Sequence, residues 1–198
     1  MKTYFTIEKE SVAEFKDRGS RFIAYAFPVK TVEDFKTQLL RLKEEHPKAV
    51  HHCFAWRTGT DGNSFRSSDD GEPSGSAGRP ILGQIDRKSL TDVGIVVVRY
   101  FGGTLLGVPG LINAYKTASA LALQTTPLIQ RPVLVHYRLQ FDYTMMNPVM
   151  TIIKQCGSVI TRQEMQLFCL LEISVPENRR EEILYRLKEL YTVEIQKI

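Results

Sequence analysis

Runs of aromatic and β-branched residues open the chain, and such runs predict β-strands. They cover residues 4–7 and 12–27. The pattern then changes to apolar residues that recur every three or four positions, which predicts an amphipathic helix ending near His46. Residues 31–34 have the form of a capping box at the start of this helix, and Pro47 marks its end.

The middle of the chain predicts strands and helices around two glycine-rich segments. The run Ile-Val-Val-Val within residues 92–100 is typical of a buried strand. Residues 58–80 predict a long loop, and loops of this length in compact domains are usually functional or disordered. The elements expected here are a strand at 53–57, the long loop, a short helix near 81–86, the strand at 92–100 and a helix from Pro109 to Gln124.

The last third of the chain has the pattern of a separate unit. Residues 125–132 contain two prolines and predict a linker. The order that follows is strand, helix, strand, strand, helix, strand, which is the ferredoxin-like pattern. The expected ranges are 133–143, 145–156, 159–162, 167–175, 178–190 and 193–197. We therefore expect an α+β protein of two domains, residues 1–130 and 131–198.

Composition places the chain among ordinary globular proteins, with 198 residues, 43% hydrophobic and 24% charged. No stretch approaches the ~18 apolar residues of a membrane span, and the N-terminus lacks the apolar region of a signal peptide. The three cysteines form neither a disulfide framework nor a zinc motif. We therefore expect a cytoplasmic protein with no membrane partner. The net charge of +4 permits contact with nucleic acid without requiring it.

Glycine is concentrated in the middle of the chain, where 11 of the 13 glycines lie between Gly59 and Gly110. Glycine is used where the backbone takes a positive φ or approaches another group closely. The candidate chemistry therefore centres on two blocks within this window, residues 67–80 and 97–110.

The first block joins an acidic loop to a Ser/Gly run that leads into a helix. Three carboxylates within four residues are suited to bind a divalent cation or to act as an acid/base pair, although they match no calcium-loop spacing. The N–H groups of a glycine-rich turn at a helix start are an anion site. The structural alternative is a turn held by its own Asp and Ser side chains. The candidates are Asp69, Asp70 and Glu72 in the acidic loop and Ser76, Gly78 and Arg79 at the helix start.

The second block has the order strand, glycine turn, helix, in which phosphate-binding loops occur. It contains neither the Walker sequence nor G-x-G-x-x-G. An arginine at the strand end is suited to bind phosphate, and a lysine near the helix start adds charge. The structural alternative is a turn that packs the helix onto the sheet, with Arg99 in an ion pair. The candidates are Arg99, Tyr100, Gly102, Gly103, Gly107, Gly110 and Lys116.

Two adjacent histidines lie on the strand that precedes these blocks. Side chains alternate along a strand, so His51 and Cys53 share one face and His52 and Phe54 the other. The two histidines therefore cannot easily share one metal ion, and a Cys–His nucleophile is disfavoured. One of the two histidines could bind a cation together with Asp69 or Asp70 only if the long loop folds back onto the strand.

Four separated blocks resemble the IMPACT family, specifically its bacterial YigZ-like branch: Ser20–Ala26, His51–Trp56, Ser68–Leu82 and Val96–Tyr115. The resemblance implies an N-terminal domain with the left-handed βαβ architecture of a small-subunit ribosomal protein and of domain IV of elongation factor G. It implies a ferredoxin-like C-terminal domain similar to those of translation factors. The family signature falls on Arg99–Gly103 and Gly107, and its acidic-glycine loop on Asp69–Pro73, without an established catalytic assignment.

The resemblance links the chain to translation. Eukaryotic relatives modulate a stress kinase through an additional N-terminal module, and because this chain starts at the strand region we do not expect that role. Our first hypothesis is a non-enzymatic protein that binds RNA or the ribosome through the glycine-rich loops, with no cofactor. The second is a metal-dependent enzyme acting on a phosphorylated small molecule or nucleotide. The third is a protein–protein adaptor, whose partner is a translation-related protein.

Overall fold

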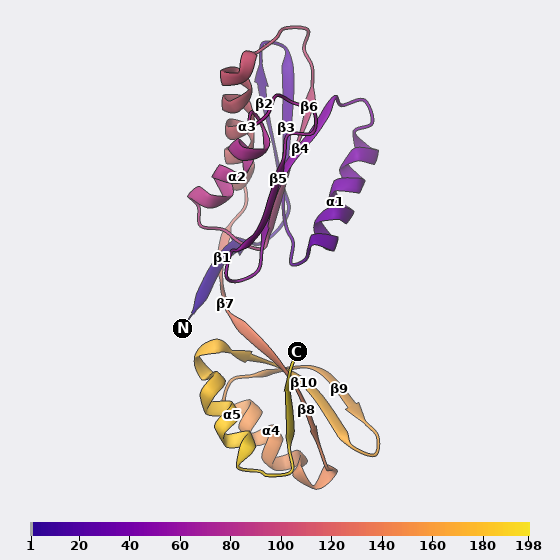
Figure 1. Ribbon diagram of the computed structural model, residues 1–198, viewed down its shortest axis with the longest axis vertical. Coiled ribbons are helices and arrows are strands. Elements are labelled where there is room, and N and C mark those ends of the chain that lie inside the picture. Colours follow the sequence, from indigo (N-terminus) through magenta and orange to yellow (C-terminus); the bar gives the residue numbers. More distant parts are fainter. Residues whose placement is uncertain (1) are drawn as a thin grey trace. The chain divides into compact units, whose positions relative to one another are not determined.

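The computed structural model describes residues 2–198, and the chain separates into two compact units (Figure 1). The larger unit is Tyr4–Arg131 and the smaller is built from Pro132–Ile198 together with the first residues of the chain. The expected domains, residues 1–130 and 131–198, stay a prediction, and this division differs from them in grouping the first residues of the chain with the smaller unit.

A five-stranded antiparallel sheet organises the larger unit, in the order β2-β3-β6-β4-β5. Because β3 and β4 both pair with β6, they run parallel to each other and are joined through helix α1. A second, two-stranded sheet pairs β1 with β7. The strands are β1 (Thr3–Ile7), β2 (Ser11–Asp17), β3 (Ser20–Pro28), β4 (His51–Thr58), β5 (Ser64–Ser68), β6 (Val93–Tyr100) and β7 (Leu128–Pro132).

Helices cover both faces of the five-stranded sheet, with α1 (Val32–Glu45) on one face and α2 (Gly78–Arg87) and α3 (Gly107–Gln124) on the other (Figure 1). The central strand β6 is buried from Val93 to Arg99, as its apolar sequence predicts. Its side chains alternate between two cores. Ile95 and Val97 pack under α2 and α3, whereas Val96 and Val98 pack under α1.

Several local predictions are confirmed, and the most detailed is the capping box of α1. The Thr31 hydroxyl accepts from the Asp34 amide at 3.0 Å, and the Asp34 carboxylate accepts from the Thr31 amide at 3.0 Å. Three other predictions need correction. Residues 58–80 are not all loop, because β5 pairs with β4. Residues 125–132 are not only a linker, because β7 pairs with β1. Helix α3 begins at Gly107, before Pro109.

The smaller unit has the βαββαβ order that the sequence predicts, with an antiparallel sheet ordered β11-β8-β10-β9. This is the ferredoxin-like arrangement. Two helices cover one face of the sheet and share its apolar core. Its elements are β8 (Leu134–Phe141), α4 (Met146–Gln155), β9 (Val159–Met165), β10 (Cys169–Pro176), α5 (Arg180–Lys188) and β11 (Glu194–Lys197). The α+β, two-domain fold is therefore as expected, and the left-handedness of the β3–α1–β4 connection stays a prediction.

Within residues 2–198, each helix is too short or too polar to cross a membrane. The three cysteines are free and buried.

Two glycines test how tightly the larger unit is packed. A Cβ added at Gly94 in β6 would lie 2.6 Å from the Phe35 ring and 2.9 Å from the Phe27 ring, whereas one added at Gly83 in α2 has 4 Å of open space. We expect Gly94→Ala to lower the free energy of unfolding by about 1–3 kcal/mol. Gly83→Ala should raise it by about 0.5–1 kcal/mol because alanine favours a helix. Urea unfolding measures both, and equal effects of the two substitutions would contradict this packing.

Candidate functional site

The two glycine-rich blocks meet at one pocket of about 410 Å³ in the larger unit, which we call the glycine-loop pocket. Its floor is formed by nearly buried side chains and its rim by exposed ones, mostly apolar. Apart from His51, Glu72 and Arg99 the lining is apolar, which is typical of sites that take organic ligands. The lining residues are Val50, His51, Glu72, Pro73, Arg99, Phe101, Leu105, Leu106, Gly107, Val108 and Leu111.

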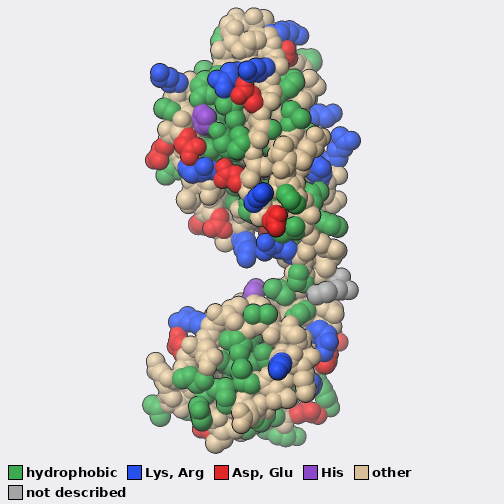
Figure 2. Space-filling view, turned by 180° about the vertical axis from the view of Figure 1, so that it is seen from behind, with side chains coloured by type: hydrophobic (Ala, Val, Ile, Leu, Met, Phe, Trp, Pro, Cys, Tyr) green, Lys and Arg blue, Asp and Glu red, His purple; other side chains and the backbone are tan. Residues whose placement is uncertain are grey.

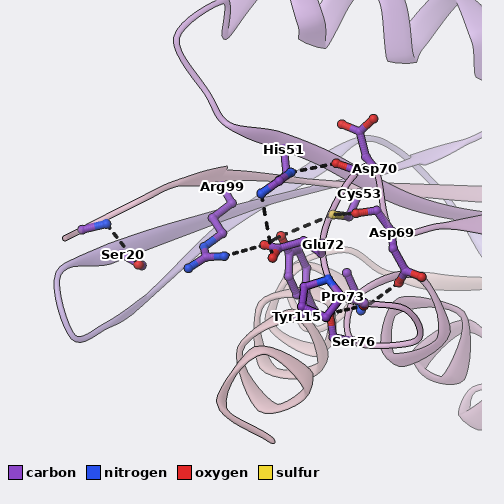
Figure 3. Close-up of polar contacts among 12 residues, drawn as sticks. Ser20, His51, Cys53, Asp69, Asp70, Glu72, Pro73, Ser76, Arg99 and Tyr115 are labelled. Atoms are coloured by element: carbon purple, nitrogen blue, oxygen red, sulfur yellow. Dashed lines mark hydrogen bonds and ion pairs between the residues drawn. The ribbon is translucent and has the colours of Figure 1, made fainter. Parts of the chain in front are cut away.

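A buried ion pair between Glu72 and Arg99 forms the floor of this pocket (Figure 3). Arg99 Nη1 donates to Glu72 Oε1 at 2.6 Å, and the two side chains are 6% and 3% exposed. The Tyr115 hydroxyl donates to the same oxygen at 2.7 Å. Burial, together with Cys53 and Glu72, raises the pKa of Tyr115 far above its ordinary value, so the hydroxyl keeps its proton. The Arg99 guanidinium also lies over the Phe22 and Phe101 rings.

His51 lies beside this ion pair, directly across from Arg99 in the pairing of β4 with β6. Its Nδ1 is 2.7 Å from the carbonyl oxygen of Asp70, and its Nε2 is 3.8 Å from Glu72 Oε2. A carbonyl oxygen only accepts hydrogen bonds, so Nδ1 carries the proton in the neutral ring and Nε2 is an acceptor.

Asp69 occupies the anion site that the sequence predicts at the start of α2. Its Oδ1 accepts from the amides of Ala77 at 3.0 Å and Gly78 at 2.8 Å, and its Oδ2 accepts from the Gly75 amide at 2.9 Å. Burial alone would raise the pKa of Asp69, but these three backbone N–H groups hold the pKa below its ordinary value. The chain's own carboxylate therefore already takes the place expected for an external anion.

The three acidic side chains of the first block point in different directions, which corrects the idea that they form one cation site (Figure 3). Asp69 faces α2 and Glu72 faces Arg99, while Asp70 Oδ2 accepts from the His52 amide at 2.7 Å. Across residues 2–198, no group of three or more His, Cys, Asp or Glu side chains is placed to hold a metal ion.

The glycines of the second block serve close backbone packing and turn geometry. A Cβ added at Gly102 would lie 1.9 Å from the Gly19 carbonyl carbon, and the Gly102 amide donates to Ser20 Oγ at 3.1 Å. Gly103 and Gly107 take positive φ values of 87° and 70°. At Gly110 an added Cβ would lie 3.0 Å from Leu106 Cβ. Gly102 therefore allows this turn to pack against the turn between β2 and β3.

Other predicted site residues lie away from the pocket lining. The Tyr100 hydroxyl is 2.8 Å from His46 Nδ1, under α1 and not under α3. His52 lies on that same side, and burial lowers its pKa. Ser76 is buried and donates to the Pro73 carbonyl oxygen at 2.6 Å. Arg79 and Lys116 are exposed on α2 and α3.

The sequence analysis missed the apolar wall of the pocket and Tyr115. Val50, Leu105 and Val108 are 51%, 83% and 45% exposed, and nothing in their sequence pattern distinguishes them from core residues. The expectation for Cys53 is consistent with its surroundings. Its thiol lies near the Asp69 carbonyl oxygen and Tyr115, and burial raises its pKa, so it is a poor nucleophile.

This site belongs to an α+β domain with a nearly buried ion pair beneath an apolar pocket. The sequence model of the Impact N-terminal domain matches residues 18–123. The IMPACT family member YigZ of Escherichia coli (strain K12) is 37% identical over 161 residues, which cover 80% of this chain and 79% of that protein. An IMPACT family member of Haemophilus influenzae is 35% identical over 182 residues, which cover 89% and 87%.

A solved structure agrees with these sequence similarities over the full length. The crystal structure of a hypothetical protein has a TM-score of 0.79 and 31% sequence identity, and the match covers 100% of this chain and 98% of that one. The chain belongs to the IMPACT family and is similar to the family's bacterial YigZ-like members.

The role of Asp69 at α2 predicts a specific pH dependence. A carboxylate whose folded-state pKa is depressed stabilises the fold above its unfolded pKa, and this contribution is lost as the pH falls through the folded value. At neutral pH, Asp69→Asn should lower the free energy of unfolding by about 1–2 kcal/mol. The difference from the wild type should shrink below about pH 4. Denaturant unfolding across pH measures this, with the exposed Glu8→Gln as control, and a difference that does not depend on pH would contradict it.

The buried ion pair predicts a non-additive double mutant. Arg99→Met leaves the Glu72 carboxylate buried without its cation and should cost about 3–5 kcal/mol of unfolding free energy. Adding Glu72→Gln removes that charge and keeps an acceptor for Tyr115, so the double variant should regain part of the loss. The exposed pair of Arg41 and Glu10 is the control, and Arg41→Met should cost less than about 1 kcal/mol. Additive losses at residues 72 and 99 would refute the coupling.

Proposed function

We propose that this chain is a non-enzymatic, translation-associated protein that contacts RNA or the ribosome through one end of its larger unit. The observation that carries the proposal is the meeting of the β2–β3 turn with the glycine loop after β6, which lie side by side in Figure 1. We call this end, with residues 16–21 and 101–105, the loop end. Similarity to the IMPACT family supports the link to translation.

Exposed cations and an exposed aromatic ring gather at the loop end. The side chains of Lys16, Arg18 and Arg21 are 70%, 58% and 49% exposed, and Phe101 is 48% exposed. Cations attract the phosphates of a nucleic acid, and an aromatic ring can stack on an unpaired base. Acidic side chains lie among the basic ones, as the mixed blue and red at the upper end in Figure 2 illustrates. The contact we propose is therefore local and modest in charge.

The proposed residues differ from the first expectation for the glycine loops. Arg99 is nearly buried and paired, and the amides at the start of α2 are taken by Asp69, so neither is offered as a phosphate contact. The exposed Arg79 and Lys116 remain proposed as peripheral phosphate contacts.

Binding to a short single-stranded RNA and to purified bacterial ribosomes tests this proposal. Affinity should fall steeply between about 50 and 200 mM salt because phosphate contacts release counterions. Lys16→Gln should weaken binding and reduce the salt slope by about 1, whereas Lys36→Gln on α1 should not. These two lysines are matched controls, since their side chains are 70% and 69% exposed. Phe101→Ala should weaken binding to the single strand.

Two outcomes would overturn the proposal. The first is no binding to either probe at low salt. The second is capture of protein partners that survive nuclease treatment and are insensitive to Lys16→Gln, which would support the adaptor hypothesis instead.

A further inference from the structure

The floor of the glycine-loop pocket contains two hydrogen-bond acceptors that receive no hydrogen bond from each other. Glu72 Oε1 already receives two donors, Arg99 Nη1 and the Tyr115 hydroxyl. Glu72 Oε2 faces His51 Nε2 at 3.8 Å. With Nδ1 donating to the Asp70 carbonyl oxygen, the neutral ring offers Nε2 only as an acceptor. In this neutral tautomer, Nε2 and Oε2 are therefore both acceptors, and neither donates to the other.

The same floor also has unused donor capacity. Arg99 uses Nη1 for Glu72, and its buried Nε has no acceptor among the residues that the structure describes. A hydroxyl group is the simplest partner for such a floor, because it can donate its proton and accept with its oxygen. Buried polar groups in proteins are normally satisfied in this way.

The charge of the floor selects against ionic ligands. Glu72 and Arg99 compensate each other, so a carboxylate entering the pocket would meet Glu72 and an ammonium would meet Arg99. The walls above them are apolar, from Val50, Leu106 and Leu111 among others, and the volume of about 410 Å³ suits a small organic molecule.

We propose that the glycine-loop pocket binds a small uncharged organic molecule with an apolar body and one hydroxyl group, whose single proton is shared between Glu72 Oε2 and His51 Nε2 in a three-centre hydrogen bond. This site does not depend on the RNA contact, because the exposed cations of that contact lie outside the pocket and, of the side chains proposed for it, only Phe101 also lines the pocket.

The test compares benzyl alcohol with toluene, which has the same ring and lacks the hydroxyl. Amide spectra of the isotope-labelled full chain are recorded with each probe. Benzyl alcohol should shift amides at residues 50–51, 105–107 and 111, and should bind several-fold to about tenfold more tightly than toluene. Benzoate and benzylamine should bind more weakly than benzyl alcohol.

Three variants locate the site. His51→Phe keeps an aromatic ring and removes one of the two acceptors, so benzyl alcohol should lose part of its preference over toluene. Val108→Phe fills the pocket and should abolish binding of both probes. Val12→Phe is the matched control and should change neither, since Val12 and Val108 are 48% and 45% exposed.

Any one of the following outcomes would overturn the proposal. Benzyl alcohol shifts no amides around the pocket, toluene binds as tightly as benzyl alcohol, a charged probe is preferred, or Val108→Phe leaves binding unchanged. The comparison of probes on the wild-type chain stands by itself if His51→Phe fails to fold.

Discussion

The ion pair between Glu72 and Arg99 is the contact on which the arrangement of both glycine blocks depends. Neither charge is tolerated alone at this depth, because desolvation of an unpaired ion costs several kcal/mol. The acidic loop after β5 must therefore fold back onto the end of β6 for either residue to be buried. Tyr115 adds α3 to the same carboxylate, so one oxygen atom joins three segments that are far apart in sequence.

The glycines of these blocks are explained by the closeness that this arrangement imposes. At Gly78, an added Cβ would lie 2.7 Å from the Ser68 amide nitrogen, and at Gly102 it would collide with the backbone of Gly19. Both contacts are between backbone segments, which cannot move aside as a flexible side chain can. At these two positions glycine therefore allows loops to pack against each other, and the phosphate-loop interpretation of the sequence is not needed to account for them.

Local chemistry explains which parts of the fold could be predicted from the sequence. The capping box at Thr31, the buried strand β6 and the alternating faces of His51 and His52 follow from interactions within a few residues. Strand β5 was missed because Ser64–Ser68 is largely polar and exposed, as befits an edge strand, and its pairing with β4 supplies the hydrogen bonds.

In the candidate site, too, individual residues could be predicted from the sequence, whereas their partners far away in the chain could not. Arg99 was identified because a lone arginine after an apolar strand is conspicuous. Its partner, 27 residues away, is set by how the acidic loop folds back, and a sequence pattern does not encode that distance. For Asp69 the sequence left open a cation site, an acid/base pair and a turn held by its own side chains, because its three N–H donors come together only when α2 begins beside it. Leu105 and Val108 are ordinary apolar residues in the sequence, and only the fold shows that they are exposed at the pocket rim.

Because the ion pair is buried, binding of a polyanion at the loop end and binding of a small molecule in the pocket depend on different interactions. A guanidinium that is already paired and desolvated adds little to the long-range field of the protein, so attraction of a polyanion must come from exposed cations such as Lys16 and Arg18. The pocket beneath has a compensated charge, and its selectivity must come from shape and hydrogen bonds. Contacts of the first kind weaken with salt, whereas binding of an uncharged molecule in the second depends little on it. Phe101 belongs to both surfaces, because it lines the pocket and is half exposed to solvent. A molecule seated in the pocket and a strand stacked on that ring would therefore compete for the same side chain.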